Sequence, residues 1–283
     1  MTARRKSIIS RALFYVLVVI ILIYTMFPFY WAIKSAFTPR AQLFATPVEY
    51  FPSNPSLEHF REVFTNATFI RALVNSTFVA GSVTLLSLLI GSIAAYALGR
   101  FRFRGRSPVL YLVLAMTMFP QIAILGSLFN MVTNLGLYNS PYALIMTYLI
   151  FTLPFTVWVL TNFFKGMPAD LEQAAYVDGA SPFQTFYMVL LPLTAPGLVT
   201  TGLLAFIAAW NEFLYALSFT NTPEQQTVPV AIFRFAPTTG SSFEVPWGPI
   251  MAATVVVTIP LIVLTLIFQR RILAGLTAGA VKG

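Results

Sequence analysis

Six apolar stretches, each long enough to cross a lipid bilayer as a helix, run through this chain. A hydrocarbon core about 30 Å thick requires about 20 helical residues. Every stretch is too long for a buried strand or an ordinary core helix, and the short alternating runs of a membrane β-barrel are not seen. We therefore predict an all-α membrane protein with six transmembrane helices, at residues 12–33, 73–98, 108–131, 142–164, 195–217 and 248–268.

The composition supports a membrane protein and excludes several other classes. Only 9% of the 283 residues are charged and 58% are hydrophobic, whereas a soluble domain is about 25% charged. The chain has no cysteine, which excludes disulfides, cysteine-ligated metals and thiol nucleophiles. His59 is the sole histidine and is interpreted as a solvated residue outside the membrane. We therefore predict no metal site, and an enzyme is the weakest interpretation.

The basic residues predict the orientation of the chain. Six crossings place the segments 1–11, 100–107, 165–192 and 269–283 on one side, and the first apolar stretch is interpreted as an uncleaved signal anchor. That side holds Arg4, Arg5, Lys6, Arg11, Arg100, Arg102, Arg104, Arg106, Lys165, Arg270, Arg271 and Lys282, whereas the other holds Lys34, Arg40, Arg61, Arg71 and Arg234. Because positive charge favours the cytoplasmic side, we expect a multi-pass plasma-membrane protein with both termini in the cytoplasm. The basic run 101–106 then anchors the topology, and no nucleic-acid partner is expected.

The lengths of the loops divide the chain. Residues 1–33 are the cytoplasmic N-terminus and first span, and residues 34–71 are an extracytoplasmic segment. Within that segment, Ser56–Phe64 is predicted to form an amphipathic helix with positions 57, 60, 63 and 64 on one face. Residues 72–268 form a transmembrane domain with an inner loop, 165–192, and a proline-rich outer loop, 219–247. Residues 269–283 are a cytoplasmic tail.

The inner loop contains a helix signal of its own. Pro168 suits a first helical turn, Asp170 and Glu172 complement the positive end of the helix, and Gly179 is typical of a left-handed C-terminus. An apolar second helix, from Phe183 to Leu190, is predicted to end at Pro192. A plain connector needs only about 2–8 residues, so a helix that docks on a partner competes with a connecting loop as the interpretation.

Three motifs resemble one known family. Glu172-Gln173-Ala174-Ala175, with Asp178-Gly179-Ala180 and Leu191-Pro192 after it, looks like the EAA loop of ABC-importer permeases, although Gln173 replaces the usual alanine. Trp210-Asn211-Glu212-Phe213 is similar to a stretch of sugar permeases. The tail Gly275–Gly283 resembles the smaller permease subunit of maltose/trehalose-type transporters.

The resemblance implies a type I ABC importer permease fold and a heteromeric complex. The implied partners are a second permease subunit, two copies of a cytoplasmic ABC ATPase, an extracytoplasmic sugar-binding protein and a sugar, with maltose- or trehalose-like sugars preferred. No Gly-x-x-x-x-Gly-Lys-Ser/Thr loop occurs in this chain, so ATP and Mg are expected on the partner ATPase, with no cofactor here. The residues implied to couple the chain to the ATPase are Glu172, Ala174, Ala175, Asp178, Gly179, Ala180, Pro182 and Pro192.

Polar and aromatic residues in the spans are candidates for the sugar path. Amides, carboxylates, hydroxyls and aromatic faces suit a sugar, which gives the candidates Asn75, Gln121, Asn130, Trp210, Asn211, Glu212 and Tyr215. Glu212, the only carboxylate in a predicted span, is expected near the outer interface, either at the end of the path or as an acid anchored beside Trp210.

Further residues of the spans have packing interpretations. The small residues Ser87, Gly91, Ala95 and Gly99 predict close helix packing, with a cavity lining as the alternative. Pro120, Pro154 and Pro260 are expected to kink their spans.

A self-sufficient secondary transporter or channel for a small polar solute is the competing function. Such transporters usually show inverted repeats and ionisable residues at mid-membrane depth. The sequence shows neither to inspection, which favours an ATP-driven sugar importer.

Overall fold

Helices form all the regular structure in the described part of the chain. The computed structural model describes residues 2–235 and 245–280, with side chains for 11–235 and 245–270. The longer helices are α1 (Thr2–Phe37), α3 (Ala67–Arg100), α4 (Arg106–Thr117), α5 (Gln121–Asn134), α6 (Pro141–Gly166), α10 (Ala195–Trp210) and α13 (Trp247–Ala280). The shorter ones are α2 (Glu58–Thr65), α7 (Asp170–Val177), α8 (Pro182–Gln184), α9 (Leu191–Leu193), α11 (Leu214–Phe219) and α12 (Val228–Phe233), with the 3-10 turns Arg40–Gln42 and Pro223–Gln225. The predicted all-α class is confirmed.

The spans comprise four unbroken helices and two bent pairs. The stretches Arg11–Phe37, Ala67–Arg100, Pro141–Gly166 and Trp247–Arg270 are each long and apolar enough to cross a membrane, and the total is six if each bent pair counts as one span. The pair α4 and α5 bends by 95°, and the pair Pro182–Leu193 and α10 bends by 76°. The kink expected at Pro120 is confirmed, because Pro120 separates α4 from α5. The predicted span 195–217 is wrong in extent, because α10 ends at Trp210.

The chain divides into two compact units, one made of residues 1–67 and 234–258 and the other of residues 68–233 and 259–283. We refer to them as unit 1 and unit 2. In unit 1, α2 confirms that a helix forms where residues 56–64 were predicted to be helical, but the buried residues differ from the prediction. Val63 and His59 are fully buried, whereas Leu57 and Phe64 are exposed.

His59 is therefore not the solvated residue that was predicted. Its Nε2 lies 3.0 Å from the carbonyl oxygen of Thr38. A Cβ at Gly248 would lie only 2.3 Å from the imidazole ring, so the ring packs directly against that glycine. The burial of His59 thus joins three segments of unit 1 that are distant in sequence.

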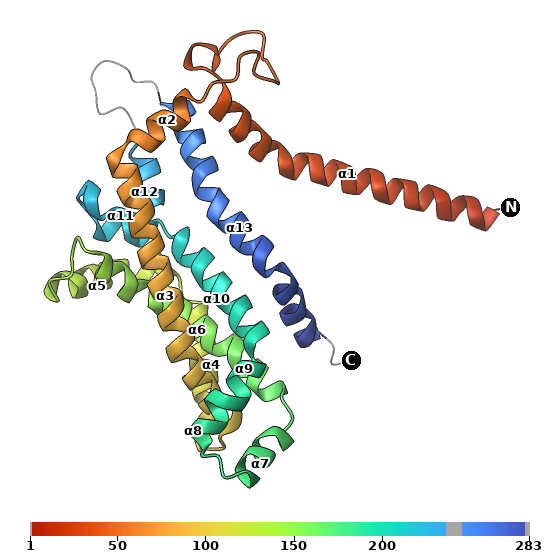
Figure 1. Cartoon of the computed structure of the whole chain (residues 1–283), viewed down its shortest axis with the longest axis vertical. Helices are drawn as coiled ribbons and strands as arrows, with labels where there is room; N and C mark the ends of the chain where they lie inside the picture. Colours follow the sequence, from red (N-terminus) through yellow and green to blue (C-terminus); the bar gives the residue numbers. More distant parts are fainter. Residues whose placement is uncertain (1, 236–244, 281–283) are drawn as a thin grey trace. The chain divides into compact units, whose positions relative to one another are not determined.

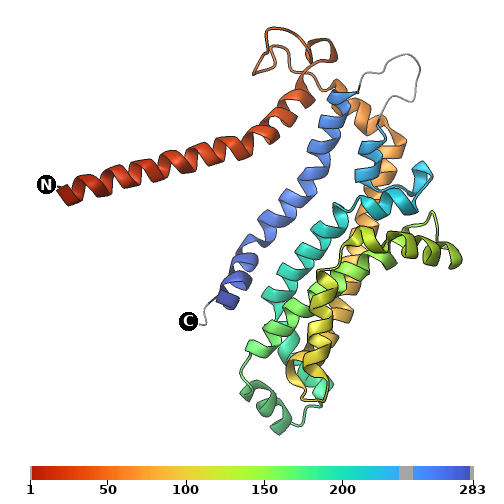
Figure 2. The ribbon, with the colours of Figure 1, turned by 180° about the vertical axis from the view of Figure 1, so that it is seen from behind.

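Helix α6 packs against both α4 and α10 in unit 2, and α3, α6 and α10 run along the same length of the unit (Figures 1 and 2). The small-residue ridge of α3 meets α6: a Cβ at Gly91 would lie 2.6 Å from Thr156 Cγ2, and one at Gly99 would lie 2.8 Å from Phe164 Cβ. Ser87 also shares a hydrogen bond of 2.8 Å with Thr152. The packing interpretation of this ridge is confirmed.

Contacts between loops show that the helices of unit 2 alternate in direction. At one end, Arg100 at the end of α3 contacts Glu172 in α7. At the other end, Asn75 near the start of α3 contacts Glu224, and Asn139 between α5 and α6 contacts Phe219 after α10. Figure 1 shows α7 and α11 at opposite ends of unit 2. Successive loops therefore lie at opposite ends, as the predicted crossings require.

Candidate functional site

Helix α7 is a short helix, exposed over most of its surface, at one end of unit 2. It spans Asp170–Val177, with acidic residues in its first turn and Gly179 at φ 83° just beyond its end. The positive φ is a conformation that glycine adopts without a Cβ penalty. The predicted helix and its glycine terminator are confirmed, as is the apolar second helix, which runs over Pro182–Leu193 with a π-helical segment at Thr185–Leu190.

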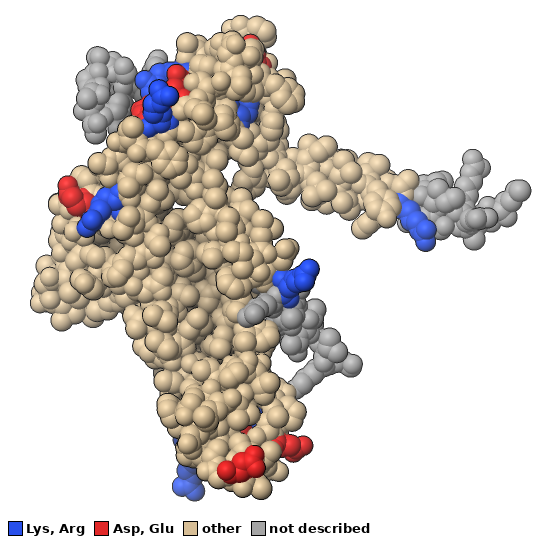
Figure 3. All heavy atoms as spheres, in the orientation of Figure 1, with Lys and Arg blue, Asp and Glu red and all other residues tan. Residues whose placement is uncertain are grey.

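The exposed side of α7 combines the apolar side chains of Val177 and Ala174 with acidic neighbours. Val177 is 88% exposed, and Ala174 and Asp178 are exposed, whereas Ala175 is buried within the chain. Ala174 and Ala175 therefore face different ways, and only Ala174 remains available to a partner. Figure 3 shows acidic side chains at this end of unit 2 and an uncharged surface over its middle.

Glu172 is turned toward the chain instead of outward. Its Oε2 lies 2.5 Å from Nη2 of Arg100, and the side chains are only 10% and 15% exposed for Arg100 and Glu172, respectively. Nη1 of Arg100 also donates hydrogen bonds to the carbonyl oxygens of Phe164 and Met167, at 3.2 and 2.9 Å. These carbonyls close the C-terminal end of α6, where backbone acceptors lack helical partners.

The motif residues that follow α7 build the second helix. Ser181 and Gln184 form a reciprocal capping box around Pro182, the first residue of that helix. Ala180 closes the end of α7 by donating its N–H to the Ala175 carbonyl at 2.9 Å. Pro192 lies in the last turn, two residues before Thr194, where the chain bends into α10.

The opposite end of unit 2 holds the first part of the predicted outer loop in a fixed conformation. The amide of Asn75 donates to the carbonyls of Glu224 and Gln226, at 2.8 and 2.9 Å. The Oδ1 of Asn139 accepts the N–H groups of Asn221 and Thr222, at 2.8 and 3.0 Å. Both asparagine side chains are thus engaged with the loop backbone.

The rest of the predicted outer loop includes Pro237 and Gly240, which lie outside the described residues. The tail motif Gly275–Gly283 lies outside the residues whose side chains are described.

Glu212 caps a helix. Its two carboxylate oxygens accept the backbone N–H groups of Tyr215 and Ala216, at 2.9 and 3.1 Å, at the start of α11. The side chain of Glu212 is buried, and the hydroxyl of Tyr148 lies beside it. The carboxylate therefore has a structural role that accounts for its place in the fold.

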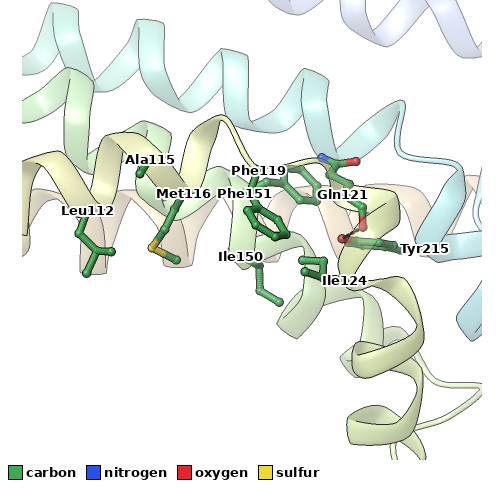
Figure 4. A pocket seen from close by; sticks show the side chains of 9 residues that line it. All are labelled: Leu112, Ala115, Met116, Phe119, Gln121, Ile124, Ile150, Phe151 and Tyr215. Atoms are coloured by element: carbon green, nitrogen blue, oxygen red, sulfur yellow. Dashed lines mark hydrogen bonds between the residues drawn. The ribbon is translucent and has the colours of Figure 1, made fainter.

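A cavity of about 310 Å³ lies between α4, α5, α6 and α11 (Figure 4). The hydroxyl of Tyr215 reaches it and donates to the carbonyl oxygen of Gln121 at 3.1 Å. The remaining lining is apolar: Leu112, Ala115, Met116, Phe119, Ile124, Ile150 and Phe151. Because a sugar requires several hydrogen-bond partners, this cavity does not by itself provide a sugar site.

The structure brings together only two of the seven candidate path residues, Gln121 and Tyr215, in this cavity. Asn75 holds the outer loop, Asn130 is exposed on α5, and Trp210 is buried against Phe206. Asn211 is exposed and donates its amide to the carbonyl of Ile207 at 3.0 Å.

Sequence reasoning missed two residues that organise the ends of unit 2. Arg100 was only counted among the basic residues that predict the orientation, and Asn139 was not singled out. Asn139 has φ 59°, and the turn signal Asn-Ser-Pro at 139–141 could have indicated it. Arg100 could have been singled out because it is the first charged residue after the long apolar stretch that ends near residue 98.

The chain is similar to permeases of one family. The family model for the "binding-protein-dependent transport system inner membrane component" matches residues 87–277. The trehalose/maltose transport system permease protein MalG of Thermococcus litoralis is 42% identical over 281 residues, which are 99% of each chain. The trehalose transport system permease protein SugB of Mycobacterium tuberculosis is 43% identical over 261 residues, 92% of this chain and 93% of that protein.

A solved structure shows the same fold. A chain of a bacterial ABC transporter that imports the acidic polysaccharide alginate aligns with a TM-score of 0.83 and 22% identity, covering 94% of this chain and 97% of that one.

Proposed function

This chain belongs to the family of binding-protein-dependent transport system inner membrane components, and from that premise we propose that it carries a trehalose- or maltose-like di- or oligosaccharide. It is the permease subunit of an ABC sugar importer and is not itself the ATPase. The observation that carries the proposed substrate class is the 42% identity, over nearly the whole chain, to a trehalose/maltose permease.

In the proposed complex, this chain pairs with a different permease subunit, two copies of an ABC ATPase and an extracytoplasmic binding protein. ATP and Mg belong to the ATPase, whose closure would displace α7. The permease would then rock between inward-facing and outward-facing states, which differ in their contacts with each partner.

Helix α7 is the proposed contact with the ATPase. Its support is the exposure of Val177, Ala174 and Asp178 on a helix that projects from one end of unit 2. An apolar side chain beside acidic ones suits an apolar cleft with basic residues at its rim. The proposed coupling residues then divide into a contacting set on this face and a supporting set, Glu172, Ala175 and Gly179.

The proposed orientation places the α7 end of unit 2 and both termini of the chain in the cytoplasm. That end carries Arg100, Arg102, Arg104, Arg106 and Lys165, whereas Arg71 lies near the opposite end of α3. The excess of positive charge favours the cytoplasmic side.

The outer loop is the proposed contact with the binding protein. The part of this loop at residues 220–228 is held by Asn75 and Asn139 and presents Pro223 and Glu224 to solvent. Residues 72–268 remain the proposed transmembrane domain, preceded by the first span (1–33) and the outer segment (34–71) and followed by the tail (269–283). Asn211, exposed after α10, remains a proposed contact on the sugar path, together with Gln121 and Tyr215.

Reconstitution tests this function directly. The chain, its companion permease and the ATPase would be placed in liposomes with ATP inside, and uptake of labelled trehalose and maltose would be measured with and without the binding protein. We expect uptake that requires both hydrolysable ATP and the binding protein. Uptake by this chain alone, driven by a proton gradient, would instead establish a secondary transporter.

A further inference from the structure

Arg100 lies where three helices of unit 2 meet. It is the last residue of α3, and its side chain is only 10% exposed. Four oxygen acceptors surround it: the carbonyls of Phe164 and Met167 on Nη1, and the carbonyl of Pro168 and the Glu172 carboxylate on Nη2, at 3.2, 2.9, 3.5 and 2.5 Å. A single side chain therefore joins α3 to the end of α6 and to the first turn of α7.

The chemistry of this junction requires an arginine. The C-terminal carbonyls of α6 carry the partial negative charge of the helix dipole and lack the partners four residues ahead that carbonyls of the helix interior have. A planar guanidinium group can satisfy them on one edge while it binds a carboxylate with another nitrogen, whereas the compact ammonium group of lysine cannot span both. Because the pair is mostly buried, loss of either partner leaves an uncompensated charge.

A second contact fastens the far side of α7 to the same helix. Tyr96, about one turn before Arg100 on α3, donates its hydroxyl to the carbonyl of Pro182 at 3.3 Å. Its ring lies 5.8 Å from the Phe164 ring and 5.0 Å from the Phe186 ring, between centroids. Helix α7 is therefore held at both flanks, by Arg100 before it and by Tyr96 after it.

We propose that Arg100 is a positioning residue that fastens α7 to α3 and α6, so that a displacement of α7 moves both transmembrane helices as one body. This inference rests on the proposed function, in which α7 receives work from the ATPase. It assigns Glu172 to the support of α7 and leaves direct contact with the ATPase to the exposed face around Val177. Without Arg100, α7 would still be attached through the chain and Tyr96, but its movement would be transmitted incompletely.

Coupling in the reconstituted complex is the first test. Arg100→Met removes the charge and all four hydrogen bonds, and we expect sugar transported per ATP hydrolysed to fall at least about tenfold, a coupling loss of ordinary allosteric size. Arg100→Lys keeps the charge beside Glu172 but not the reach to the α6 carbonyls, and an intermediate loss is expected. Arg104→Met is the matched control, because Arg104 is an exposed arginine of the same loop, and it should behave as wild type.

A distance measurement separates positioning from other causes of failure. Since the chain has no cysteine, spin labels can be attached at Ile93→Cys on α3 and Gln173→Cys on α7, both exposed positions. In the complex, we expect a narrow distance distribution that broadens with Arg100→Met and stays narrow with Arg104→Met. A distribution that stays narrow in Arg100→Met, or an Arg100→Lys variant with wild-type coupling, would overturn the proposal.

The spin-label result does not depend on the transport assignment. If no ATPase assembles with the chain, the proposed function fails while the broadening in Arg100→Met is still expected. If ATP-driven transport is observed and the broadening is absent, only the role of Arg100 fails.

Discussion

The carboxylate of Glu212 accepts two backbone N–H groups at the start of α11 and is buried there. At the scale of single residues, these contacts favour the structural alternative over a role in the sugar path. A buried acceptor with ready partners stabilises the helix start, and its loss leaves two donors unsatisfied.

We predict that Glu212→Gln lowers the stability of the assembled complex without changing the KM for sugar. The amide keeps one acceptor but turns its NH₂ group toward a backbone N–H, which costs about 1–3 kcal/mol. Melting of the solubilised complex and initial uptake rates measure the two effects. Glu49→Gln, at an exposed acid outside the outer loop and the spans, is the control, and a raised KM with unchanged melting would restore Glu212 to the sugar path.

Sequence alone left the role of Glu212 open for a physical reason. The predicted span continued to residue 217, and inside a continuous helix the N–H groups of residues 215 and 216 would already be bonded. Only the end of α10 at Trp210 frees those donors for the carboxylate. Glu212 precedes Tyr215 and Ala216 by three and four residues, which is a suitable spacing for capping their N–H groups. The sequence indicates this role only if the helix is known to end at Trp210.

At the scale of helices, the contact between α3 and α6 depends on the absence of side-chain atoms. Gly91 lets Thr156 approach so closely that a Cβ would lie 2.6 Å from its methyl group, whereas nothing lies within 4 Å of a Cβ at Gly81 on the same helix. The four-residue spacing of small residues was sufficient to predict this packing, because it follows directly from helical geometry.

We predict that Gly91→Ala destabilises the complex by about 1–3 kcal/mol through overpacking, and that Gly81→Ala is neutral or slightly stabilising. Thr156→Ser removes the clashing methyl group and keeps the hydroxyl that donates to the Thr152 carbonyl. The double variant Gly91→Ala/Thr156→Ser should therefore regain most of the lost stability. Thermal unfolding of the wild type, the two glycine variants and the double variant checks this. A double variant as unstable as Gly91→Ala would contradict the contact between Gly91 and Thr156.

The bends within spans were predicted less well than their lengths. The proline within the third apolar stretch predicted a kink at Pro120, and the chain turns there by 95°. The 76° bend between α9 and α10 follows a π-helical segment at Thr185–Leu190. Such a segment has no simple pattern in the sequence. Its residues Phe186 and Leu190 pack with residues of α3 and α6.

At the scale of the whole molecule, unit 2 carries a fixed loop at each end. Arg100 fastens the α7 end, and Asn75 with Asn139 fastens the loop of residues 220–228 at the other end. That successive loops lie at opposite ends could be predicted from the six apolar stretches and the distribution of positive charge. The residues that fasten the loops could not, because each bonds to segments distant in sequence.

We predict that Asn139→Ala weakens binding of the sugar-loaded binding protein while ATP hydrolysis without it is unchanged. A hydrogen bond that orders the loop contributes about 1 kcal/mol net, and its loss corresponds to about a fivefold rise in Kd. Asn139→Gly, which also removes the side chain but tolerates the positive φ, separates side-chain loss from backbone strain. Binding of labelled binding protein to the reconstituted complex gives Kd, and wild-type affinity in both variants would contradict the role of Asn139.

In the proposed function, α7 lies on the cytoplasmic side and receives work from a separate ATPase. The most direct test is labelling of a single cysteine, Val177→Cys, with a membrane-impermeant maleimide in oriented vesicles. We predict labelling in inverted vesicles stripped of the ATPase, protection when the ATPase is added back, and no labelling in right-side-out vesicles. Labelling from the outside would contradict the cytoplasmic location of α7. Labelling that added ATPase leaves unchanged would contradict its contact with the ATPase.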